Sequence, residues 1–183
     1  MATGLLFAVV TVMEKRLISR NFENLADFMA AFGAIHICRA VVLFGIAFPS
    51  GISLDTAGTL WSLAAGVSTG LALKLYFYAL SVEDSTRVAP LVATTPAFTV
   101  LIAILLFRES ISTMQLFGLA VIVLGSIVIS LRLVNNRLRF FNKKAMWAAA
   151  ASSFFASWIM LSIDQATLHN DPLDTEIVRA LTT

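Results

Sequence analysis

Charge is the scarcest property of this sequence. Only 13% of its 183 residues are charged, whereas 58% are hydrophobic and the mean hydropathy is +0.87. Soluble domains carry about 25% charged residues, so a soluble protein of this composition would lack most of its polar surface. Because the apolar residues fall into long runs, the composition indicates an integral membrane protein.

Other absences narrow the class further. The single cysteine, Cys38, can form no internal disulfide, and the net charge of +2 is too small to indicate a nucleic-acid partner. The sequence has no Gly-rich phosphate loop, no paired His/Cys metal spacing and no Gly-x-Ser-x-Gly motif. It therefore points to no enzyme, and we expect no cofactor and no metal site.

The strands of a membrane β-barrel alternate between apolar and polar residues, and the apolar runs of this sequence show no such alternation. Only helices and closed barrels satisfy the backbone in lipid. The sequence therefore predicts an all-α fold, a polytopic bundle of membrane helices.

Short polar breaks divide the chain into six apolar runs and the start of a seventh. The predicted spans cover 4–19, 28–48, 57–82, 87–107, 114–133 and 145–163, and a further helix begins near Asp174. Most approach the roughly 20 residues that a bilayer crossing needs. Residues 1–133 form a predicted five-helix domain, 134–144 a basic connector, and 145–183 the truncated start of a second domain.

A faint internal repeat supports this division. Shifting the chain by about 150 positions places residues 4–25 on 154–175, and Glu14 falls on Asp164. Each copy is an apolar helix with an acidic residue near its end, followed by a polar turn. An odd number of spans per copy predicts that the second copy is inverted in the membrane.

Small residues recur on single helix faces. Gly66 and Gly70 are four apart in the third span, and Gly118 and Gly125 are seven apart in the fifth. Membrane helices use such residues for close contact, so we interpret both pairs as packing surfaces.

Four ionisable residues are candidates for charged groups at membrane depth: Glu14, Arg39, Lys74 and Glu109. A charge at membrane depth costs about 2.5 kcal/mol or more, so such residues usually face protein or water. We take Lys74 and Arg39, which are deepest, as candidates for a substrate path. A structural ion pair of either residue with Glu14 is the alternative.

Glu14 is equally well explained as a path residue or as a group that reaches the interface with Lys15 and Arg16. Glu109 is better explained as helix punctuation, because a negative charge suits the start of the next helix. His36, one turn before Arg39, is more typical of a helix contact than of a site.

The fourth span carries Thr94, Thr95 and Pro96 in mid-helix. Pro96 removes one helical hydrogen bond and frees the carbonyl of Val92, which nearby threonine hydroxyls can partly satisfy. A kinked helix of this kind could border a substrate cavity or could serve packing alone. Tyr76, just after Lys74, is a further candidate for the path.

A set of motifs over about 60 residues resembles the EamA-type repeat of the drug/metabolite transporter superfamily. The motifs are Tyr76-Phe-Tyr-Ala-Leu80, Ser85-Thr-Arg-Val-Ala-Pro90, Thr95-Pro-Ala-Phe98, Phe107-Arg-Glu109, and Gly118 with Leu124-Gly125. Relatives usually carry Gly before the acidic residue of the closing motif, where this chain has Arg108.

The resemblance implies ten helices in two inverted repeats, with the substrate path between them, so the chain looks like a fragment. It implies a multi-pass protein of the inner or plasma membrane that moves a small organic solute by alternating access. Transport could be coupled to a proton. A homodimer could complete a path that one chain only half builds. A non-transporting assembly or sensor subunit on the same scaffold is the alternative function.

Membrane orientation stays open at this level. Nine Lys and Arg residues fall in connections one, three and five, but only Arg108 falls in connections two and four. The positive-inside rule then places the odd connections in the cytoplasm and the N-terminus outside. The resemblance implies both termini inside.

Overall fold

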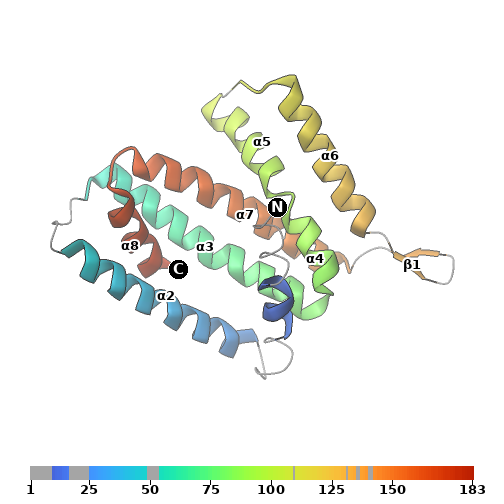
Figure 1. The fold of residues 1–183 in the computed structure, drawn as a ribbon, viewed down its shortest axis with the longest axis horizontal. Helices are drawn as coiled ribbons and strands as arrows, with labels where there is room; N and C mark the ends of the chain where they lie inside the picture. The colour runs from blue at the N-terminus through green and yellow to red at the C-terminus, as the bar shows by residue number, and fades with distance from the viewer. Residues whose placement is uncertain are drawn as a thin grey trace.

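The computed structural model describes residues 10–16, 25–48, 54–108, 110–130, 132–134, 137–139 and 142–183. Residues 10–16 are helical. The other elements, drawn in Figure 1, are α2 (Leu25–Ala47), α3 (Thr56–Val82), α4 (Ser85–Val92), α5 (Thr95–Phe107), α6 (Thr113–Ser130), β1 (Arg132–Val134), β2 (Arg137–Arg139), α7 (Lys143–Thr167) and α8 (Pro172–Thr182).

The predicted helical architecture is confirmed in the described part of the chain. Four stretches are long and apolar enough to cross a membrane: Ala26–Ala47, Thr56–Val82, Ser85–Phe107 and Lys143–Thr167. The third of these combines α4 and α5. The first predicted span lies largely outside the described residues, and α6 forms a shorter apolar helix.

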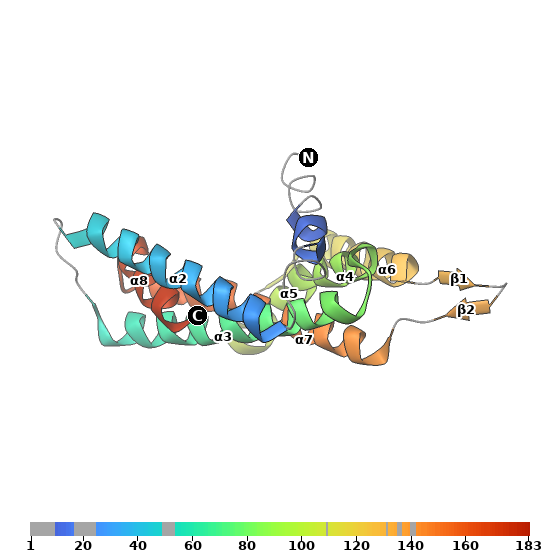
Figure 2. The ribbon, with the colours of Figure 1, turned by 90° about the horizontal axis from the view of Figure 1, so that it is seen from below.

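The connector between α6 and α7 departs from the all-helical expectation. Its described residues form a two-stranded antiparallel hairpin in which Arg132 pairs with Arg139 and Val134 pairs with Arg137. Helix α6 therefore ends at Ser130, before the predicted end of that span at Leu133. The hairpin projects away from the helices in Figure 2.

Helices α3 and α7 run antiparallel along most of their lengths and form the centre of the fold (Figure 1). Small residues allow this close packing: Ala72 faces Ser152, whose hydroxyl donates a 2.9 Å hydrogen bond to the Ala72 carbonyl. The ring of Phe28 in α2 meets that of Phe77 edge-on, with ring centroids 4.6 Å apart. The central pair therefore positions the flanking helices.

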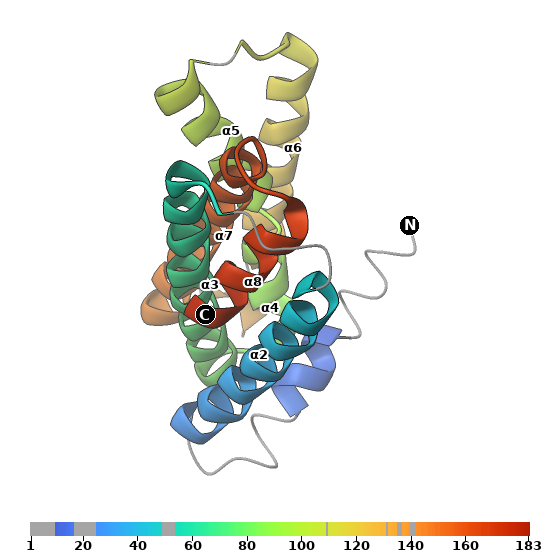
Figure 3. The same cartoon turned by 90° about the vertical axis from the view of Figure 1, so that its left-hand side faces the viewer.

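Helix α8 lies between α2 and α3, as Figure 3 shows. It approaches α3 so closely that a Cβ on Gly66 would lie 2.8 Å from the Arg179 carbonyl oxygen, and one on Gly70 would lie 3.0 Å from the Thr183 carbonyl oxygen. The packing interpretation is confirmed for these two glycines. Gly118 and Gly125 differ, because no described atom lies within 4 Å of a Cβ at either position.

Candidate functional site

Glu14 lines a cavity of about 280 Å³ between residues 10–16, α3, α4 and α7. The cavity wall is mostly aliphatic, with polar groups from Glu14, Thr69, Tyr76 and Ser152. A space of this size, apolar with a few converging polar groups, is typical of a small-molecule site. Sequence reasoning named Glu14 and Tyr76 but missed Thr69 and Ser152.

Glu14 is held in place by α3. The Tyr76 hydroxyl donates a 2.9 Å hydrogen bond to Glu14 Oε2 and lies 3.3 Å from the Thr11 hydroxyl. Lys15, the next residue along, turns to the end of α3, where its ammonium donates to the carbonyls of Leu80 and Glu83, the latter at 2.9 Å. Glu14 and Lys15 therefore point to different surroundings.

Lys74 stands apart from this cavity. Its side chain is exposed, and it makes no hydrogen bond or ion pair with any described residue. Lys74 and Tyr76 are two positions apart, so they leave α3 in nearly opposite directions. The alternative of a Glu14–Lys74 ion pair is therefore not met within the part of the chain that the structure describes.

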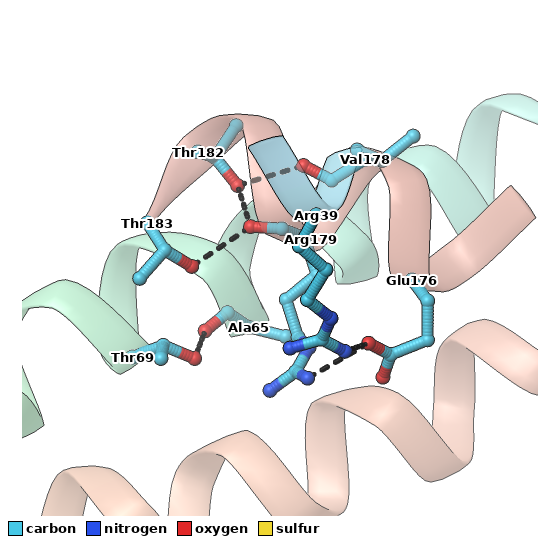
Figure 4. Close-up of polar contacts among 8 residues, drawn as sticks. All are labelled: Arg39, Ala65, Thr69, Glu176, Val178, Arg179, Thr182 and Thr183. Carbon is cyan, nitrogen blue, oxygen red and sulfur yellow. Dashed lines mark hydrogen bonds and ion pairs between the residues drawn. The ribbon is translucent and has the colours of Figure 1, made fainter. Parts of the chain in front are cut away.

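Arg39 meets α8 rather than Glu14. Its guanidinium forms an ion pair with Glu176, and Arg179 donates to the same carboxylate oxygen at 2.8 Å (Figure 4). His36 lies close enough to interact electrostatically with all three residues. We call these four residues the α2–α8 charge cluster. Sequence reasoning missed Glu176 and Arg179, although their i, i+3 spacing in the last helix was the available signal.

The predicted kink of the fourth span is a full helix break. Helix α4 ends at Val92, and α5 begins at Thr95 with Pro96 in its first turn. Thr95 Oγ1 donates to the carbonyl of Val92 at 2.6 Å, and Thr94 Oγ1 donates to that of Leu91 at 2.6 Å. The expected rescue of the Val92 carbonyl by a threonine is therefore confirmed.

Serine hydroxyls from neighbouring helices satisfy further carbonyls at the break. Ser153 and Ser157 of α7 donate to Leu91 at 3.2 Å and Thr95 at 2.8 Å. Ser126 of α6 donates to the Pro90 carbonyl at 2.8 Å. Hydrogen bonds from α6 and from α7 therefore both stabilise the helix break. The sequence signal for Ser153 and Ser157 was their i, i+4 spacing on one face of α7.

Thr94 and Ser126 also line a second cavity of about 300 Å³ between α4, α5 and α6. Glu109 lies outside the described residues. Arg108 before it closes α5 in the left-handed conformation, with φ 53° and ψ 33°. That conformation suits glycine, the residue that the resemblance implies at this position.

No three His, Cys, Asp or Glu side chains of the described ranges gather closely enough to hold a metal ion. The polar side chains that line the two cavities are the Glu14 carboxylate and the hydroxyls of Thr69, Tyr76, Thr94, Ser126 and Ser152. Such groups bind solutes and exchange protons.

Comparison with known proteins gives separate evidence on the family of this chain. The chain matches the EamA-like transporter family over residues 1–131. It is also similar to an uncharacterized transporter of Archaeoglobus fulgidus, with 33% identity over 107 residues. That alignment covers 58% of this chain and 37% of the relative, so the chain spans well under two thirds of the relative's length. No solved structure matches the chain. The family comprises transporters rather than enzymes, and its match spans most of this sequence, so the chain belongs to the EamA-like transporter family.

Proposed function

We propose that this protein moves a small organic solute across a cell membrane by alternating access, and that Glu14 and Tyr76 border the solute path. The observation that carries the proposal is a carboxylate in a mostly aliphatic cavity among apolar helices. An ionisable group at membrane depth is costly and commonly serves substrate or ion movement. The family assignment supports the same function.

The helix break between α4 and α5 suits a moving part. Two half-helices joined at residues 93–94 can tilt separately, while hydroxyls of α6 and α7 donate to main-chain carbonyls on both sides of the break. We propose that residues 1–133 form one five-helix repeat and that 145–183 begin a second, inverted one. The path would then lie between the two repeats.

Glu14 is also the best-placed residue for proton coupling. A carboxylate in a low-dielectric cavity can exchange a proton for a solute, because the two forms differ in charge by one unit. The hydrogen bond from Tyr76 would orient the carboxylate during that exchange.

A non-transporting assembly subunit is the second candidate. Such a subunit would keep its membrane charges paired with one another. The ion pair of Arg39 with Glu176 favours this second candidate. The cavity at Glu14 favours transport instead, because Glu14 has no ion-pair partner among the described residues.

The test is solute uptake by the full-length protein in proteoliposomes, with labelled amino acids, sugars and organic cations as probes. We expect Glu14→Gln to abolish uptake of the transported probe, and Lys74→Ala or Arg39→Ala to reduce it if those residues line the path. Asp84→Asn is the matched control, because Asp84 is an exposed carboxylate before α4 that makes no cap hydrogen bond, and size-exclusion profiles establish folding. Full uptake by a folded Glu14→Gln variant would overturn the assignment of Glu14, and no uptake of any probe by the wild type would favour the assembly subunit.

A further inference from the structure

The α2–α8 charge cluster carries more positive than negative charge. The guanidiniums of Arg39 and Arg179 both donate to one oxygen, Oε2 of Glu176 (Figure 4). Two cations share one anion, so the cluster is cationic by one unit even when His36 is neutral. Arginine cannot relieve this imbalance by losing a proton at physiological pH. The imbalance therefore favours a further negative group.

The cluster also has hydrogen-bonding capacity that Glu176 does not use. Arg179 Nε and His36 Nδ1 are buried and have no hydrogen-bond partner among the residues that the structure describes. A buried donor without a partner is costly, and a donor on a charged group more so. The side chain of Arg179 is only 16% exposed, whereas that of Arg39 is 41% exposed. The Nε donor of Arg179 is thus shielded, while the guanidinium of Arg39 stays accessible.

We propose that the α2–α8 charge cluster binds an anionic oxygen group, a carboxylate or phosphate, in the place where Glu176 alone now meets two arginines. The planar guanidinium forks suit such groups, which accept two parallel hydrogen bonds. Glu176 competes for the same donors and acts as an internal substitute for the bound anion. If the anion belongs to the solute, the cluster selects acidic solutes, and this part rests on the transport function proposed above.

The experiment measures anion binding directly and does not depend on transport. The full-length protein is placed in phosphatidylcholine nanodiscs and titrated with inorganic phosphate and with acetate, while glycerol serves as the neutral probe. Calorimetry gives Kd for the wild type and for Arg39→Gln, Arg179→Gln and Glu176→Gln. Arg108→Gln is the matched control, because Arg108 is an exposed arginine outside the cluster.

We expect each cluster arginine variant to weaken anion binding by about tenfold or more, and Glu176→Gln to tighten it about tenfold, because the competing carboxylate is gone. A purely structural ion pair predicts no gain for Glu176→Gln. The proposal is overturned if the wild type binds neither anion, or if both arginine variants keep the wild-type Kd. Should Arg179→Gln fail to fold, Arg179→Lys keeps the charge but loses the fork, and we expect an intermediate Kd.

A second arm separates the two sources of the anion. Adding phosphatidylglycerol to the nanodiscs should weaken phosphate binding if a lipid headgroup occupies the cluster, and should leave it unchanged if the cluster serves a soluble anion. Uptake in proteoliposomes is scored separately. Uptake of neutral solutes without anion binding would overturn this inference alone, whereas anion binding without uptake of any solute would overturn the proposed function alone.

Discussion

The Tyr76 hydroxyl lies 2.9 Å from the Glu14 carboxylate, although the two residues are 62 positions apart in the chain. This contact joins residues 10–16 to α3 at the wall of the cavity. It fixes the direction of the Glu14 carboxylate in that wall.

Tyr76→Phe should therefore impair solute uptake while preserving the fold. The ring keeps its packing, and the lost hydrogen bond to a carboxylate costs about 1.5–3 kcal/mol at the site. We expect uptake to fall about tenfold or more, as measured by initial rates in proteoliposomes. Tyr78→Phe is the matched control, because no hydrogen bond of the Tyr78 hydroxyl is found among the described residues. Equal losses in both variants would contradict the assigned role.

Ser157→Ala should destabilise the protein by about 1 kcal/mol, because the Thr95 carbonyl at the helix break loses a donor from α7. Ser162→Ala, five residues along the same helix, should be neutral or stabilising. The Ser162 hydroxyl is fully buried and has no hydrogen-bond partner in the described ranges. Unfolding in mixed detergent micelles gives both free energies. A larger loss for Ser162→Ala would refute the importance of the break.

Gly66→Ala and Gly118→Ala should act in opposite directions. A Cβ on Gly66 meets the Arg179 main chain at 2.8 Å, and overpacking of this kind costs about 1–3 kcal/mol. A Cβ on Gly118 meets no atom of the described residues within 4 Å, so the higher helix propensity of alanine should add up to about 1 kcal/mol. Thermal unfolding in detergent measures both. Equal effects would show that α8 does not approach α3 at Gly66.

Arg108→Gly should stabilise the end of α5 by about 1 kcal/mol, because its left-handed conformation strains every residue with a Cβ. Arg108→Ala removes the same side chain but retains the strain, so it should bring no such gain. The difference in unfolding free energy between the two variants isolates the backbone effect. A gain of equal size in both would point to removal of the charge instead.

Much of the fold could be predicted from local features. The sequence predicted a further helix from near Asp174, and α8 begins two residues earlier, at Pro172, because proline suits the first turn of a helix. The Thr-Pro pattern of the fourth span predicted a freed carbonyl at Val92, because the missing donor of a proline has a fixed partner four residues earlier. The hairpin at β1 and β2 was not predicted, since short polar stretches between helices carry little periodic signal.

The candidate site could be predicted only in part. Glu14 and Tyr76 were named separately, but nothing in the sequence joined them. Lys74 was taken as a site residue for its depth, yet it lies exposed in the described fold and away from Tyr76. Its place in the solute path therefore stays a prediction for the transport experiment. The depth of a residue in the membrane can be counted along its helix, whereas the neighbour that its side chain faces cannot be read from the sequence.

The sequence by itself determined that this chain is a set of apolar helices, where most of them begin and end, and which backbone carbonyls lose their partners. These properties depend on hydropathy and backbone hydrogen bonds within a few residues. Tertiary structure decided that Glu14 faces Tyr76 and that Arg39 meets Glu176, 137 positions away. The physical reason is that helices such as α2 and α3 are apolar on nearly every face, so their sequences do not fix which face turns inward. Only packing sets that rotation, and with it the partners of each charge.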